Sequence, residues 1–153
     1  MNVFGRLALL LVATFPLAKA PASPRGGEPV FIAAPAGRPF SSAVLVGDIL
    51  FMSGQIGTDA QGKLADGFAA QVRQTMDNIM AVNRDAGGTS RNIFKCTVML
   101  ANMQNWSEFN KIYLSYFDAA HLPARSAFGA SGLAMNAEAE VECWSKPNAY
   151  SGR

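Results

Sequence analysis

The sequence predicts an α+β fold in which a mixed β-sheet carries two helices on one face. Two segments have the apolar spacing of three and four residues that is typical of amphipathic helices. Several shorter segments have the apolar runs or alternation typical of strands, and they lie before, between and after the helices. The 153 residues suit one domain, and 50% of them are hydrophobic, so one sheet with packed helices is expected.

The first 22 residues resemble a signal peptide. Arg6 precedes an apolar run over residues 7–15 that is too short to cross a bilayer as a helix, and cleavage after Ala22 would follow small residues. We therefore expect a secreted or periplasmic protein with no stable membrane association after cleavage. The alternatives are an uncleaved anchor, or a mis-assigned start upstream of a cytoplasmic protein.

The rest of the chain is expected to form one domain over residues 29–148, between a linker over 23–28 and a C-terminal tail over 149–153. Apart from Arg6 and Lys19, the Lys and Arg residues equal the Asp and Glu residues in number, at 11 each. They form no basic cluster, so binding to nucleic acid is not expected.

The domain is expected to begin with an edge strand over residues 30–33 and a β-hairpin over residues 42–54. Two apolar runs of the hairpin flank Gly47 and Asp48, and glycine at the first turn position suits a type II′ turn.

The first helix is predicted over residues 67–88. Asp66 is its candidate N-cap, and Gly87 with Gly88 is its candidate stop signal. Its apolar positions are Phe68, Val72, Met76, Ile79 and Met80.

The segment NIFKCTVMLAN, residues 92–102, predicts a strand with Cys96, Val98 and Leu100 on one face. The other cysteine is Cys143, and the two have no metal-ligand spacing. They could pair in an oxidising compartment. We favour the alternative, in which both are buried thiols that behave as small hydrophobic residues.

The second helix is expected to open with Asn105 and Glu108, a pattern resembling a capping box, and to end before Pro123. His121 would then lie at the C-terminal end of this helix, where a cation is favourable, and we expect it to be structural. The apolar face comprises Trp106, Phe109, Ile112, Tyr113, Tyr116 and Phe117.

The last two strands are predicted over residues 124–130 and 137–144. The second alternates strictly and places Glu138, Glu140 and Glu142 on one face. Such a face is either solvated or lines an interface or a site.

Two charged residues are candidates for chemistry. Arg125 follows Pro-Ala, has small neighbours and could bind a carboxylate through two parallel hydrogen bonds. Glu140, expected on the neighbouring strand, could act as a general acid or base on a water molecule. A surface ion pair is the alternative. The sequence has no metal-ligand cluster and no nucleotide-binding fingerprint, so neither a metal nor a cofactor is expected.

Several motifs give the chain a family resemblance. SGQIG at residues 53–57, KCTVMLANMQNWSEFNKIYLSYF at 95–117, and PARS at 123–126 followed by AEAEVE resemble the RidA/YjgF family of reactive intermediate deaminases. The resemblance covers residues 29–146. It implies a chorismate-mutase-like fold and a homotrimer whose three sheets pack together, with sites between the subunits.

The resemblance also implies site residues. Arg125 matches the carboxylate-binding arginine, Glu140 the water-activating glutamate, and Asn110 an asparagine of the second helix. Ser53 and Gly54 match the main-chain groups of the S-G-Q turn.

Two further positions of the expected substrate pocket depart from the family pattern. Phe40 stands where a tyrosine is common, and Ala127 where a cysteine is common, so a hydroxyl and a thiol are lost from the pocket.

The implied activity is cofactor-free hydrolysis of enamines and imines, such as 2-iminopropanoate and 2-iminobutanoate, to 2-oxo acids and ammonia. A trimeric protein that binds small 2-oxo acids or other carboxylates without turnover is the alternative. An endoribonuclease or translation inhibitor is a minor alternative, against which the near-neutral charge of the mature chain counts.

Overall fold

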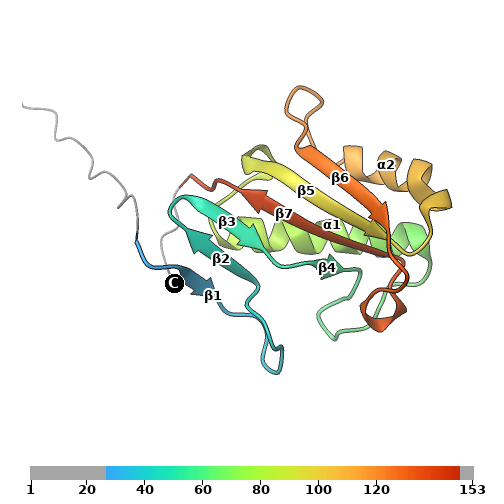
Figure 1. Ribbon diagram of the computed structural model, residues 1–153, viewed down its shortest axis with the longest axis horizontal. Helices are drawn as coiled ribbons and strands as arrows, with labels where there is room; N and C mark the ends of the chain where they lie inside the picture. The colour runs from blue at the N-terminus through green and yellow to red at the C-terminus, as the bar shows by residue number, and fades with distance from the viewer. Residues whose placement is uncertain (1–26, 149–153) are drawn as a thin grey trace, which may run out of the picture.

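The computed structural model describes residues 27–148. The predicted signal peptide, the C-terminal tail and all but two residues of the predicted linker lie outside this range. The described chain is one mixed sheet with two helices behind it in Figure 1, which confirms the predicted fold class. The strands and helices are β1 (Val30–Ile32), β2 (Ala43–Val46), β3 (Ile49–Met52), β4 (Gln55–Ile56), α1 (Phe68–Asp85), β5 (Ile93–Leu100), α2 (Trp106–Leu114), β6 (Ala124–Gly129) and β7 (Ala139–Ser145).

The strand order of the sheet is β1-β2-β3-β7-β5-β6, and the short β4 also pairs with β7. All pairs are antiparallel except β5 with β6, which run parallel because the chain crosses over through α2 between them. β5 lies between β6 and β7. The expectation that the strands carrying Arg125 and Glu140 are neighbours is therefore wrong.

The core lies between the sheet and the helices. Alternate residues of β5 and β7 point into it, among them Val98 and Val141, while Val72 and Ile79 of α1 and Phe109 of α2 fill it from the other side. The predicted apolar stripes of both helices are confirmed, since all their members are buried in this core or packed against it.

The hairpin of β2 and β3 has the predicted register, with Val46 opposite Ile49. Gly47 has a φ of 62°, whereas Asp48 is not among the residues with positive φ. A positive φ at the first turn position alone agrees with the predicted type II′ turn. The predicted edge strand is also confirmed as β1, but β4 was not predicted because two residues give no periodicity.

The start of α1 differs from the prediction. Gly67, not Asp66, occupies the N-cap, with a φ of 82° that glycine adopts without steric cost. The helix ends before Gly87, which has a φ of 83° and acts as the predicted stop signal.

α2 begins after Asn105, as predicted, but the Asn105 side chain makes no capping hydrogen bond. Asn102 caps the preceding turn instead, because its side chain accepts a hydrogen bond from the Gln104 N–H at 2.9 Å. The helix ends at Leu114, where the Ser115 hydroxyl donates to the Ile112 carbonyl at 2.6 Å.

His121 therefore lies beyond the helix, which corrects its predicted position. Its ring nitrogen Nδ1 is 3.3 Å from the Asp118 carboxylate. In the described part of the chain, neither helix is long and apolar enough to cross a membrane.

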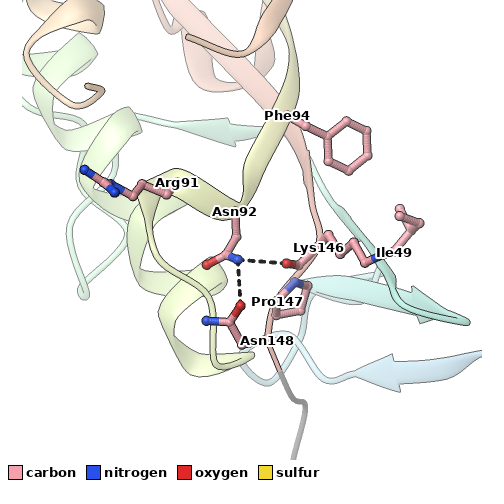
Figure 2. Close-up of a pocket in the computed structure, with 7 residues that line it drawn as sticks. All are labelled: Ile49, Arg91, Asn92, Phe94, Lys146, Pro147 and Asn148. Carbon is pink, nitrogen blue, oxygen red and sulfur yellow. Dashed lines mark hydrogen bonds between the residues drawn. The ribbon is translucent and has the colours of Figure 1, made fainter. Parts of the chain in front are cut away.

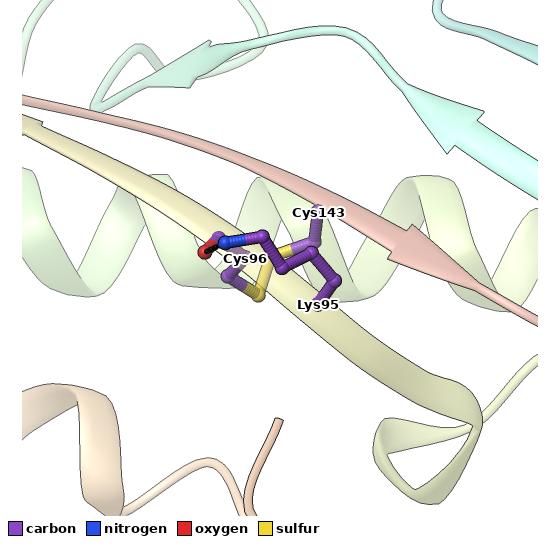
Figure 3. Close-up of a disulfide and its surroundings, with 3 residues drawn as sticks. All are labelled: Lys95, Cys96 and Cys143. Atoms are coloured by element: carbon purple, nitrogen blue, oxygen red, sulfur yellow. Dashed lines mark hydrogen bonds between the residues drawn. A yellow bond between two sulfur atoms is a disulfide. The ribbon is translucent and has the colours of Figure 1, made fainter. Parts of the chain in front are cut away.

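Cys96 and Cys143 form a disulfide, shown in Figure 3, which corrects the expectation of two free thiols. The two residues lie opposite each other on β5 and β7, with Cα atoms 4.1 Å apart, and both are fully buried. Their burial was predicted. The pairing was not, because adjacency of β5 and β7 cannot be read from a separation of 47 residues.

Candidate functional site

Glu140 lies on the open face of the sheet, the one that the helices do not cover. Its neighbours Ala139 and Val141 are buried in the core, so the alternation of β7 turns Glu140 the other way. The side chain is half-buried, and its Oε1 atom lies against the α-carbon of Gly54. A β-carbon at position 54 would overlap this carboxylate, so the close approach requires glycine.

The turn at Ser53 and Gly54 is fixed by hydrogen bonds to the start of the hairpin. The Ser53 N–H donates to the Ser42 carbonyl at 3.0 Å, and the Ser53 hydroxyl donates to the Ser41 carbonyl at 2.7 Å. The Gln55 side chain donates to the Ser53 carbonyl at 3.0 Å. The backbone beside Glu140 is therefore held in place before any ligand arrives.

The pKa of Glu140 is raised above its ordinary value. Burial is the main cause, because it penalises the charged form, and the nearby Glu142 adds to the shift. A carboxyl whose pKa is moved toward neutrality can both accept and donate a proton.

Arg125 lies on the opposite face of the sheet. It is in register with Cys96 of β5, whose side chain is buried on the helix side. Its guanidinium carbon is 4.7 Å from the ring centroid of Trp106 and 4.5 Å from that of Tyr113, both on α2. Both distances are within the range of cation–π attraction.

The Arg125 guanidinium has no acidic partner among residues 27–148. Within this range it forms no salt bridge and no side-chain hydrogen bond, and its Nη1 atom is buried without a partner. The Tyr113 hydroxyl is likewise buried without a partner. Burial raises the pKa of Tyr113 to about 12, although the nearby Arg125 lowers it, so this hydroxyl stays protonated at neutral pH.

Asn110 and Ala127 belong to the same side of the sheet as Arg125. Asn110 follows Trp106 by four residues and precedes Tyr113 by three, which places it on the same stripe of α2, and it is half-buried. Ala127 is two residues past Arg125 on β6, in register with Val98, and is also half-buried.

Phe40 lies on the loop before β2. It is 48% exposed and directly precedes Ser41, whose carbonyl accepts the Ser53 hydrogen bond. The backbone thus connects Phe40 to the Ser53–Gly54 turn rather than to Arg125.

The predicted site residues therefore form two groups within one chain. Ser53, Gly54 and Glu140 lie together on the open face, while Arg125, Asn110 and Ala127 lie on the helix face. The structure does not bring Glu140 and Arg125 together. Their strands are separated by β5, where Glu140 is in register with Met99 and Arg125 with Cys96.

Comparison with known proteins places the chain in a family. A family model described as Endoribonuclease L-PSP matches residues 31–146. A RutC family protein of Aquifex aeolicus is 43% identical over 106 residues, which are 68% of this chain and 85% of that protein. The chain belongs to the RidA/YjgF/L-PSP (RutC) family.

Two other members of the RidA family extend the comparison. The 2-iminobutanoate/2-iminopropanoate deaminase of Bos taurus is 38% identical over 106 residues, covering 68% of this chain and 77% of the relative. The crystal structure of a Rid-family protein of unknown function from Yersinia pestis has a TM-score of 0.74 at 35% identity. It covers 78% of this chain and 99% of that one.

A surface pocket of this RidA-family chain is separate from both groups of site residues. Figure 2 shows it at the end of the sheet where β7 leaves for the C-terminus; its lining residues are Ile49, Arg91, Asn92, Phe94, Lys146, Pro147 and Asn148. Its two cations are already paired, Lys146 with Asp48 at 2.8 Å and Arg91 with Asp118 at 3.0 Å. Elsewhere in residues 27–148, no group of three or more His, Cys, Asp or Glu side chains could hold a metal ion.

The sequence did not identify Trp106 and Tyr113 as site residues, although it placed both on the apolar face of α2. The available signal was their spacing around Asn110, which puts all three on one stripe. Aromatic residues at helical spacing are ordinary core residues, so this stripe pointed to packing alone.

Proposed function

We propose that this protein is a hydrolytic deaminase of 2-imino acids. In the reaction, water adds to the C2 carbon of the imine, the C–N bond breaks, and the products are a 2-oxo acid and ammonia. An enamine substrate first takes a proton at C3 to become the imine. Membership of a family that includes 2-iminobutanoate/2-iminopropanoate deaminases supports the proposal.

The observation that carries the proposal is the unpaired guanidinium of Arg125. A half-buried arginine without an acidic neighbour keeps its full positive charge for an incoming anion. The carboxylate of a 2-imino acid matches the planar, two-donor geometry of a guanidinium. Arg125 would bind this carboxylate and so fix the position of the adjacent C2 carbon.

We propose that Glu140 accepts and donates the protons of the reaction. Its raised pKa suits a group that takes a proton from water during addition and returns it to the departing nitrogen. The fixed turn at Ser53 and Gly54 borders its carboxyl group and would orient the substrate beside it. Orientation and charge placement are expected to supply most of the rate enhancement.

We further propose that the working form is a homotrimer with each site between two subunits. Arg125 and Glu140 cannot meet within one chain, so a complete site needs Arg125 of one subunit and Glu140 of the next. The open face of the sheet also presents large apolar side chains beside its carboxylates, with Phe128 50% exposed and Trp144 38% exposed. Packing of this face against neighbouring subunits would bury them.

Export through the predicted signal peptide remains part of the proposal. The disulfide supports it, because such bonds form and persist mainly in oxidising compartments. N-terminal sequencing of the mature protein would test it, and a chain that starts with Met1 in the cytoplasmic fraction would contradict it.

The deaminase assay uses an imine made in situ by an amino-acid oxidase. We expect 2-oxo acid and ammonia to appear faster than by spontaneous hydrolysis with the wild-type protein, and not with Arg125→Ala. Equal rates for the two proteins would refute the proposal.

A carboxylate-binding protein without turnover is the second candidate. The separation of Arg125 from Glu140 favours it, because within one chain the arginine has no acid–base group beside it. Calorimetry with 2-oxobutanoate separates the candidates when it is combined with the turnover assay. Binding without turnover would support the second candidate, and absence of both would exclude the two together.

A further inference from the structure

The guanidinium of Arg125 is positioned by aromatic rings rather than by acidic groups. Trp106 and Tyr113 are seven residues apart on α2, which is about two helical turns, and both rings contact the guanidinium. With neither a salt bridge nor a side-chain hydrogen bond at Arg125 among residues 27–148, these two ring contacts are the specific interactions that orient it.

The two edges of the guanidinium face different surroundings. Nη1 is buried and has no hydrogen-bond partner. Nε and Nη2 do not share this state of being both buried and without a partner. Since no hydrogen bond within the described residues engages them either, Nε and Nη2 keep some surface accessible to solvent. One edge is therefore directed inward, and the other is available to a ligand.

The two rings pack against further aromatic side chains. Tyr113 is 2% exposed, and its ring centroid is 5.7 Å from that of Phe109 and 4.7 Å from that of Phe117. Phe109 in turn stacks on Trp106 at 5.9 Å. The two rings that contact Arg125 thus belong to a continuous aromatic stack anchored in the core.

We propose that Trp106 and Tyr113 are positioning residues that hold the Arg125 guanidinium with its outer edge ready for the substrate carboxylate. This inference rests on the proposed function, because it takes the carboxylate to be the ligand of Arg125. We call the pair of rings the aromatic clamp.

The aromatic clamp offers two physical advantages over an acidic partner. A free arginine side chain loses rotamer entropy on binding, and part of this cost is met when the rings restrict the side chain beforehand. Neutral rings also leave the positive charge intact, whereas a carboxylate neighbour would compete with the substrate for the same donors.

Titration calorimetry with 2-oxobutanoate tests the clamp through Trp106. Trp106→Leu removes one ring contact from a half-buried position, and we expect roughly three- to tenfold weaker binding. Trp106→Phe keeps an aromatic face and should recover most of the affinity. Tyr116→Phe is the matched control, because it removes a hydroxyl that bonds to Asp77 of α1 and no contact with Arg125.

A second pair of variants separates the ring of Tyr113 from its hydroxyl. Tyr113→Leu removes the ring and should weaken binding as Trp106→Leu does, while Tyr113→Phe should recover most of that loss. Melting temperatures identify any variant that fails to fold. If Tyr113→Leu fails to fold, the two Trp106 variants decide whether the ring contacts support binding.

Nuclear magnetic resonance of arginine-labelled protein tests the clamp independently of binding and turnover. Ring currents should displace the Arg125 side-chain resonances from their usual positions, and Trp106→Leu should remove much of the displacement. Undisplaced wild-type resonances, or a Trp106→Leu variant that binds 2-oxobutanoate as the wild type does, would overturn the clamp while leaving the proposed function intact. Displaced resonances without any 2-oxobutanoate binding would overturn the role of the clamp in carboxylate binding together with the proposed function.

Discussion

Arg125 and Glu140 lie on opposite faces of one β-sheet, with strand β5 between the strands that carry them. Each chain therefore presents half of the proposed site on each of two surfaces. This arrangement makes assembly a condition of the proposed catalysis, and it gives the proposed trimer a direct chemical test.

The test is complementation between two inactive variants. Arg125→Ala and Glu140→Gln should each be inactive alone, but trimers mixed from both contain some sites with an intact arginine and an intact glutamate. With random mixing in equal amounts, about a quarter of the sites should be intact. We expect about a quarter of the wild-type activity after co-expression, and no recovery in trimers verified as mixed would contradict a site between subunits.

Lysine should not replace Arg125. Arg125→Lys keeps the charge but loses the two-donor edge and much of the stacking on Trp106 and Tyr113. We expect binding of 2-oxobutanoate to weaken by at least about tenfold, measured by calorimetry, with an unchanged melting temperature. Lys63→Arg, at an exposed position, serves as the control for exchanging the two side chains.

Glu140→Gln should separate turnover from binding. The amide cannot accept or donate the proton, so kcat should fall by about 100-fold or more, while calorimetry should show retained affinity for 2-oxobutanoate. A variant that keeps wild-type kcat would remove Glu140 from the proposed mechanism.

The same substitution should change the pH dependence of stability. The raised pKa of Glu140 means that the folded chain binds this proton more tightly than the unfolded chain does. The contribution of this proton to the stability of the folded chain is therefore fully present below the pKa of Glu140 in the unfolded chain. It is lost as pH rises through the pKa of Glu140 in the folded chain. Denaturant titrations should show that Glu140→Gln gains stability relative to the wild type over this interval, and a constant difference would contradict the shift.

Gly54→Ala should impair activity more than folding. The new methyl group would meet the Glu140 carboxylate, which can swing aside because it ends a flexible side chain. We expect kcat to fall by about tenfold or more, with a stability loss of at most about 1–3 kcal/mol. Gly132→Ala is the matched control, since its β-carbon would meet no atom within 4 Å, and it should behave as the wild type.

The disulfide should contribute measurably to stability. Loop-closure entropy for a separation of 47 residues corresponds to about 4 kcal/mol, which Cys96→Ala with Cys143→Ala should lose in denaturant titrations. A reductant should destabilise the wild type and leave the double variant unchanged. Equal stability of the oxidised wild type and the double variant would show that the bond constrains little.

Much of the fold could be predicted from local pattern. The hairpin, both helices and the alternation of β7 follow from apolar spacing and from glycine at turns. Strand neighbours could not be predicted, because whether β7 lies beside β6 or beside β5 depends on packing across the whole chain. Helix ends were missed where backbone and hydroxyl groups replaced the expected caps, as at Gly67 and Ser115.

The site was predictable only as a set of residues. The family motifs named Arg125, Glu140 and the Ser53–Gly54 turn, but no sequence pattern reveals that the first two face opposite sides of the sheet. Gly54 contacts Glu140, and Arg125 contacts the rings of α2. Each of these contacts joins residues that are far apart in sequence or lie on different elements, so no local pattern predicts it.

The unpaired guanidinium of Arg125 also has a consequence for the choice of buffer. A charge without an acidic neighbour is open to any small anion, so chloride, phosphate and acetate will compete with a 2-oxo acid for it. Apparent dissociation constants should therefore rise with the concentration of the buffer anion, and most steeply for anions that can accept two parallel hydrogen bonds. Affinities of related proteins are comparable only when they are measured against the same background anion.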